Sequence, residues 1–191
     1  VGLLLMPPSK TAGSLLVLDY GSHDTDWFRP YFTETLDSLG HAYDVWDTEL
    51  RGPPDADVLS PYVDGTVIWA APQWGHIIYT PFCGIPSYLD AGGRLFLASR
   101  ETGHYLDDWG NTDFLHNYLH ARYAQSDVGL NALDGVAGDP IGDGLTLEIS
   151  SGAEMDPISP AVPVFVYDAG SASTANGPLQ PLDCDLQRWE S

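Results

Sequence analysis

The sequence predicts an α/β fold with a mainly parallel sheet and a β-rich C-terminal extension. Between residues 15 and 125, short continuous apolar runs alternate with segments of helical periodicity. Such runs are typical of strands that are buried on both faces, as in a parallel sheet. After about residue 127 the helical periodicity ends, and Gly, Pro, Asp and Ser separate short β-like segments.

Strands and helices are expected to alternate from the start of this region. The first strand is expected at 15–18, directly before Asp19. A helix follows it, because apolar residues recur at helical spacing and Gly40 can end the helix. The recurring residues are Phe28, Phe32, Leu36 and Leu39. Asp24 and Asp26 precede the helix and are candidate N-caps. Three further strands are predicted, at 43–46, 65–71 and 94–99.

A loop and two more helices complete the expected domain. The Pro-rich segment 52–61 is predicted to be a loop. Helices are predicted at 80–91, where Pro86 weakens the pattern, and at 113–123. This alternation indicates a doubly wound sheet of the flavodoxin or Rossmann type. In the extension, β segments are predicted at 145–149 and 162–167.

We expect one α/β domain over 15–168, with the β-rich extension packed onto it. Residues 1–14 are interpreted as a linker or the remnant of a preceding module. The apolar stretch that follows Val1 lacks the basic leader of a signal peptide, so a cut from a longer precursor is the preferred interpretation. Residues 169–191 are expected to form an irregular tail.

Charge is the most pronounced feature of the composition. The 27 acidic and 7 basic residues give a formal net charge of -20. Nucleic acid is excluded as a partner, because its phosphates require Lys and Arg. Membrane insertion is excluded as well, because no apolar run approaches the roughly 20 residues of a spanning helix. The acids form either a solvated coat or Asp-rich loops that hold Ca²⁺, the one cofactor that the composition suggests. The Asp-Gly turns at 139–144 lack the calcium-loop signature and are predicted to be plain turns.

The two cysteines, Cys83 and Cys184, lie far apart in the sequence and have no metal-binding spacing. They form either one disulfide in an oxidising compartment or two unrelated buried thiols.

Several stretches carry a resemblance to a known family. They are 43–47 (YDVWD), 67–69 (VIW), 88–97 (YLDAGGRLFL) and 117–121 (NYLHA). Together with the order of elements over 15–125, they resemble the class I glutamine amidotransferase-like fold. The specific likeness is to a domain of large secreted bacterial and archaeal proteins, often found beside peptidase modules.

The resemblance implies that the catalytic centre of the family is missing. Catalytic members carry a cysteine on the turn after the strand that 94–99 resembles, with Gly two positions later. Gly103 matches that Gly, which puts Glu101 in the place of the cysteine. The C-terminal His-x-Glu pair of the family is also absent, because the last histidine is His120.

The segment from Ser99 to His104 is the best enzymatic candidate. It follows a predicted parallel strand, at the sheet edge where α/β folds bind ligands. Glu101 could act as general base or nucleophile with His104 nearby. Alternatively, Glu101 pairs with Arg100 or with backbone amides at the next helix start.

Other candidate sites each have a structural alternative. His116 and His120 would share a helix face and could bind zinc, although such pairs are usually structural. Asp19 could bind a ligand, and Asp24 and Asp26 are candidate metal ligands or caps, with His23 beside them. Trp74 and Trp109 could stack on a carbohydrate or a peptide, or pack under loops. Trp46 and Trp69 are expected in the core.

We therefore expect a non-catalytic assembly or binding module of a secreted or cell-surface protein. Its partners would be other protein modules or copies of itself. One alternative is a hydrolase that uses Glu101 and His104. Another is a structural subunit of an extracellular assembly.

Overall fold

The computed structural model describes residues 13–19, 28–71, 77, 83–99, 101–125, 132–148, 154–163 and 165–167. The chain forms two compact units, Val1–Ala98 and Ser99–Ser191. Among the described residues, no helix is both long enough and apolar enough to cross a membrane.

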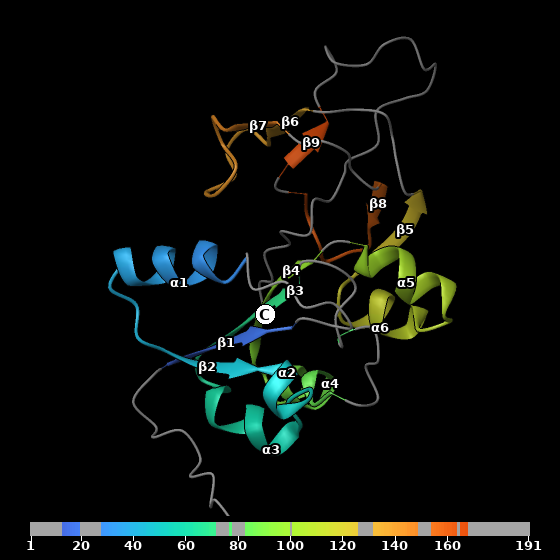
Figure 1. Cartoon of the computed structure of the whole chain (residues 1–191). Coiled ribbons are helices and arrows are strands. Elements are labelled where there is room, and N and C mark those ends of the chain that lie inside the picture. Colours follow the sequence, from blue (N-terminus) through green and yellow to red (C-terminus); the bar gives the residue numbers. More distant parts are fainter. Residues whose placement is uncertain are drawn as a thin grey trace, which may run out of the picture. The chain divides into compact units, whose positions relative to one another are not determined.

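The first unit is built on a four-stranded parallel sheet with the order β2-β1-β3-β4 (Figure 1). The strands are β1 Ser14–Leu18, β2 Tyr43–Asp47, β3 Thr66–Ala71 and β4 Arg94–Ser99. In β1, Leu16 is fully buried and lies between Val45 of β2 and Ile68 of β3. The continuous apolar runs therefore form parallel strands, which confirms the predicted α/β class.

Helices cover both faces of this sheet, as Figure 1 shows, with α1 on one side and α2, α3 and α4 on the other. They are α1 Arg29–Ser38, α2 Thr48–Arg51, α3 Ala56–Leu59, the 3₁₀ helix η2 Ser60–Tyr62 and α4 Ile85–Asp90. The predicted apolar face of α1 packs Phe32 and Leu36 against the buried Leu16 and Leu18. Helix α1 ends at Ser38, and Gly40 adopts a positive φ of 68° just beyond it, as expected for a helix stop.

Two predictions of local structure in this unit are wrong. The segment 52–61 is not a plain loop, because the Asp55 side chain accepts a 3.0 Å hydrogen bond from the Val58 N–H and caps α3. Helix α4 begins only at Ile85, so Pro86 lies in the first turn, where its missing N–H has no helical acceptor. The N-cap position of α1 is Phe28, and the candidate caps Asp24 and Asp26 lie outside the described residues.

The second unit contains two short helices and two antiparallel sheets. The helices are α5 Thr102–Asp108 and α6 Thr112–Asn117. β5 Ala121–Gln125 pairs with β8 Glu154–Pro157, and the other sheet has the order β7-β6-β9. Its strands are β6 Ala132–Gly135, β7 Thr146–Glu148 and β9 Phe165–Tyr167. The extension is therefore β-rich, as predicted.

The helix predicted at 113–123 is wrong in its second half. Helix α6 ends at Asn117, and His120 takes a left-handed φ of 45° before β5 begins at Ala121. A helix cannot continue through a residue with this conformation. His116 and His120 consequently do not share a helix face, so the spacing argument for a zinc pair fails.

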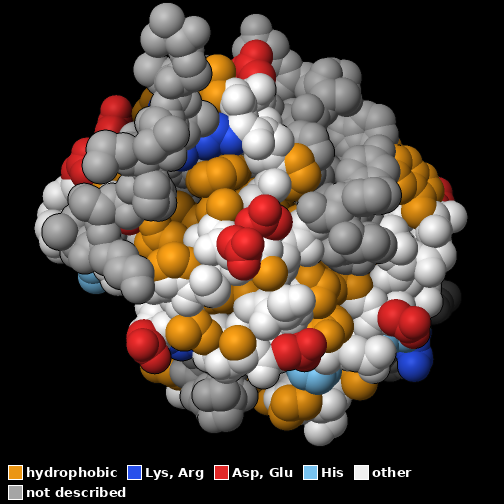
Figure 2. Space-filling model, turned by 90° about the horizontal axis from the view of Figure 1, so that it is seen from below, with side chains coloured by type: hydrophobic (Ala, Val, Ile, Leu, Met, Phe, Trp, Pro, Cys, Tyr) orange, Lys and Arg blue, Asp and Glu red, His pale blue; other side chains and the backbone are white. Residues whose placement is uncertain are grey.

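On the face that Figure 2 shows, acidic side chains are spread rather than gathered in one place. Figure 2 shows Asp and Glu at several separate positions on the face seen from below, between apolar and uncharged polar groups. This distribution agrees with a solvated acidic coat. Asp139, in the Asp-Gly segment, accepts hydrogen bonds from the N–H groups of Ile141 (2.8 Å) and Gly142 (2.9 Å), and so closes a turn.

Candidate functional site

The turn from β4 into α5 has an unusual backbone. Glu101, the N-cap residue of α5, has φ 67° and ψ 5°, in the left-handed region that few residues other than Gly, Asn and Asp adopt. Its side chain is exposed. Strained positions of this kind cost about 1–3 kcal/mol and persist only where the surroundings fix them. The predicted nucleophile position is therefore a constrained turn.

Packing on the residues after Glu101 fixes this turn. The hydroxyl of the buried Thr102 forms a short hydrogen bond with the Ser99 hydroxyl, at the end of β4. Gly103 lies against Met155, and a Cβ atom at Gly103 would be only 2.6 Å from the Met155 sulfur. A Cβ atom at position 103 would therefore require the flexible end of the Met155 side chain to move.

His104 lies on α5 and is engaged by neighbours other than Glu101. Its Nε2 atom is 3.4 Å from a carboxylate oxygen of Asp108, one turn further along the helix. Its ring lies 5.0 Å from the Tyr105 ring and 5.4 Å from the Tyr123 ring, measured between centroids. Its Nδ1 atom is buried and has no hydrogen-bond partner in the described part of the chain. The carboxylate that orients this imidazole is thus Asp108.

Asp19 lies at the carboxyl end of β1 and is completely buried. One carboxylate oxygen accepts a hydrogen bond from the Thr48 hydroxyl (3.2 Å), and the other accepts from the Trp69 indole N–H (2.8 Å) and the Ile77 N–H (3.3 Å). Because a buried carboxylate needs such donors, this network ties β1 to α2, to β3 and to Ile77, six residues beyond the end of β3. The geometry gives Asp19 a structural role, and ligand binding by Asp19 stays a prediction.

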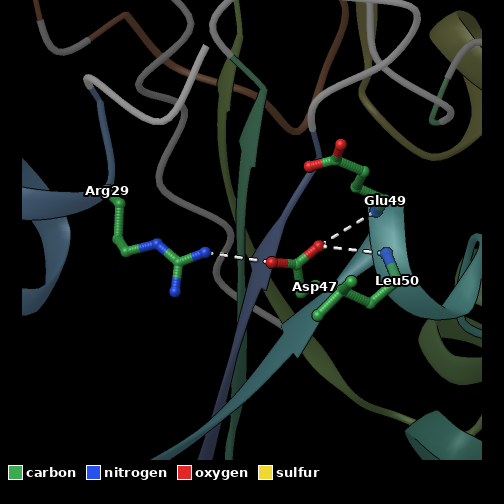
Figure 3. A network of polar contacts seen from close by, with 4 residues as sticks. All are labelled: Arg29, Asp47, Glu49 and Leu50. Atoms are coloured by element: carbon green, nitrogen blue, oxygen red, sulfur yellow. Dashed lines mark hydrogen bonds and ion pairs between the residues drawn. The ribbon is translucent and has the colours of Figure 1, made fainter. Parts of the chain in front are cut away.

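Asp47, at the carboxyl end of β2, is also engaged within the first unit (Figure 3). One of its oxygens accepts a 2.9 Å hydrogen bond from the Arg29 guanidinium of α1. The other accepts from the N–H groups of Glu49 (3.0 Å) and Leu50 (3.2 Å) and caps α2. The carboxylates that end β1 and β2 are thus both bonded to neighbouring elements.

Cys83 is buried in the first unit. Burial raises the pKa of its thiol to about 11, and the charge of nearby Asp19 adds to the rise, while backbone hydrogen bonding at Ile85 lowers it. A thiol with this pKa is almost entirely protonated at neutral pH and is a poor nucleophile. Cys184 lies outside the described residues, so the choice between a disulfide and two thiols stays a prediction.

The remaining candidates are the predicted metal ligands and the tryptophans. Among the described residues, no group of three His, Cys, Asp or Glu side chains could hold a metal ion. Asp24, Asp26 and Trp74 lie outside the described residues. Trp69 is fully buried, as expected for a core residue, whereas Trp109 is 43% exposed at the end of α5.

Sequence reasoning gave no bounds for helix α5 and missed Tyr105, although it named Trp109. Tyr105 packs edge-on against Trp109 at 5.7 Å. The signal was present in the spacing of Glu101, Tyr105 and Trp109, each four residues apart. It was overlooked because Gly103 and two adjacent Asp residues weaken the helical pattern.

No protein-family model matches the chain, and searches of the curated proteins and of the solved structures find no match either. The sheet order β2-β1-β3-β4 is consistent with a doubly wound domain and identifies no family.

Proposed function

We propose that this chain is a non-catalytic binding or assembly module of a secreted or cell-surface protein. In this proposal its fold is a variant of the glutamine amidotransferase-like domain that has lost the catalytic centre. The observation that carries the proposal is the turn at Glu101, which keeps a left-handed backbone at the nucleophile position but presents a carboxylate there.

The chemistry near this turn supports binding rather than acyl transfer. A cysteine in the same place would be an activated thiolate, whereas a carboxylate is a much weaker nucleophile toward an amide. The thiol of Cys83 is buried and protonated, and it precedes β4 in the chain. His104 is oriented by Asp108, so its Nε2 faces a carboxylate of its own helix.

The charge supports a location outside the cell. A net charge of -20 with one lysine gives a strongly hydrated surface that resists association in salty water. Partners of such a module would be other protein modules or copies of itself, brought together by specific contacts rather than by general attraction.

The test is a panel of amide, ester, peptide and glutamine substrates, measured with the full chain. We expect rates equal to those of buffer alone. Turnover that disappears in Glu101→Gln but persists in Glu34→Gln, which removes an exposed carboxylate from α1, would overturn the proposal.

A hydrolase is the second candidate, and one observation favours it. Strained backbone clusters at active sites, and Glu101 is strained three residues before an imidazole. A hydrolase that uses His104 would lose its rate in His104→Ala, and Asp108→Asn, which removes the carboxylate 3.4 Å from the imidazole, would change the rate as well.

A further inference from the structure

Helix α5 has two faces of opposite character. Thr102, Gly103 and Leu106 are buried and hold the helix against its own unit. The other face carries Glu101, His104, Tyr105, Asp108 and Trp109. Because residues three and four apart are neighbours on a helix, these five side chains form one continuous strip.

Four rings in and beside this strip touch one another, and we call them the aromatic row: His104, Tyr105, Trp109 and Tyr123. Centroid distances are 5.0 Å from His104 to Tyr105, 5.7 Å from Tyr105 to Trp109, and 5.4 Å from His104 to Tyr123. Trp109 is 43% exposed, and the His104 side chain is 32% exposed. The row is therefore a partly exposed aromatic surface rather than core.

Carboxylates stand at both ends of the row on α5. Glu101 is exposed, and the Asp108 side chain is 55% exposed. The π faces of aromatic rings carry partial negative charge, so rings and carboxylates both attract cations.

We propose that the aromatic row binds Arg or Lys side chains of an extended segment of a partner protein. This inference rests on the proposed function, because it names the partner chemistry of the binding module. Charge complementarity carries it, since the Asp108 carboxylate lies 3.4 Å from Nε2 of His104 in the row and Glu101 stands at the start of the same helix, so the charge beside the stacked rings favours a cation. A second copy of this acidic chain would bring like charges together, which disfavours self-association at this surface.

The separation of Glu101 and Asp108 along α5 sets the spacing that we expect for the basic residues of the partner segment. Glu101 and Asp108 are seven residues apart, which is about 10 Å along a helix axis. Side chains of a polyproline II segment point the same way every third residue, about 9 Å apart. A segment with Arg at every third position can therefore place one guanidinium near each carboxylate, with the rings between them.

The experiment is calorimetric titration of the full chain at about 0.15 M NaCl. The probe is an acetylated and amidated peptide of the pattern Gly-Arg-Pro-Pro-Arg-Gly, and its control replaces both Arg by citrulline, which has the same shape without the charge. We expect the Arg peptide to bind and the citrulline peptide to bind at least about tenfold more weakly, since charge-assisted contacts supply the affinity.

Matched variants distinguish binding of the peptide at the aromatic row from its attraction to the general negative charge of the chain. Trp109→Ala and Asp108→Asn should each weaken peptide binding about threefold to thirtyfold. Tyr31→Ala and Glu34→Gln remove an exposed ring and an exposed carboxylate from α1 and should change the affinity less than about twofold. Far-UV circular dichroism and thermal melting verify that all four variants fold.

Three results would overturn the inference. Equal losses in the α5 and α1 variants would mean that the acidic coat alone attracts the peptide. Binding of cellohexaose or chitohexaose, but not of the Arg peptide, would assign the row to carbohydrate. Self-association that Trp109→Ala abolishes would assign it to a second copy. If the Arg peptide does not bind and the substrate panel is blank, the inference about the row fails and the proposed function stands. Turnover in the substrate panel overturns the proposed function, whether or not the peptide binds.

Discussion

The left-handed backbone at Glu101 predicts that a Gly variant is more stable than an Ala variant at this position, the reverse of their usual order of stability. A left-handed conformation costs an L-residue about 1–2 kcal/mol, and Gly is exempt. Gly loses about 0.5–1 kcal/mol more chain entropy than Ala on folding. With φ at 67°, we therefore expect Glu101→Gly to be more stable than Glu101→Ala by about 0.5–1 kcal/mol. Both variants lose the same side chain, so the difference isolates the backbone.

The control for this comparison is Glu34, an exposed residue inside α1. At Glu34 we expect the usual order of stability, with the Ala variant more stable than the Gly variant by about 0.8–1 kcal/mol. Urea unfolding of the four variants gives both differences from their midpoints. Ala exceeding Gly in stability at both positions would show that the turn relaxes without strain, and it would remove the structural basis for singling out Glu101.

Further perturbations test other parts of the structure. Asp47→Ala removes the cap of α2 and the partner of Arg29, so it should lower the unfolding free energy by about 1–2 kcal/mol in urea titration, with Asp57→Ala as an exposed control that stays within about 0.5 kcal/mol. With the pKa of Cys83 raised to about 11, native Cys184→Ser protein should be alkylated at pH 8 at least about 100-fold more slowly than in urea; equal rates would exclude burial of the thiol. Because the folded state holds the protons of Cys83 and Tyr62 more tightly than the unfolded state, the contribution of these two groups to stability should be constant below about pH 8, and stability should fall as pH rises through 9 to 11. A flat alkaline limb would contradict the raised pKa values. The net charge of -20 predicts that the melting temperature rises with NaCl from about 10 mM upward, and a further rise in millimolar Ca²⁺ that chelator reverses would identify a specific site rather than a coat.

The parallel sheet could be predicted from sequence because its signal is local. A run such as Leu15–Leu18 has no polar residue to place at a surface, so it must be buried on both faces, and β1 lies inside the sheet between β2 and β3. Edge strand β2 was predictable for a different reason, namely the aromatic and β-branched residues of 43–46.

The second unit was harder to predict because its turns use residues without a turn signal. Phe114, Leu115, Tyr118 and Leu119 continue a helical pattern past Asn117, where the helix ends. The break is made by His120 in a left-handed conformation, which sequence patterns assign to Gly or Asn. Likewise, Gly103 lies in α5 next to Met155, a contact made by tertiary packing that the local sequence pattern does not show.

Asp19 shows where a site prediction from position alone reaches its limit. Its place directly after a buried strand is where ligand-binding acids occur in α/β folds, and the sequence contains nothing against that role. The indole of Trp69 lies 50 residues away in sequence, and tertiary folding alone brings its N–H to the carboxylate. A carboxylate that accepts from three donors inside its unit has few directions left for a ligand. By contrast, the Asp108 side chain on α5 is 55% exposed, so its carboxylate can be reached from solvent. Binding by this module is therefore expected at the α5 strip, where ring faces and carboxylates favour one sign of charge, and not at the buried acids that hold the sheet together.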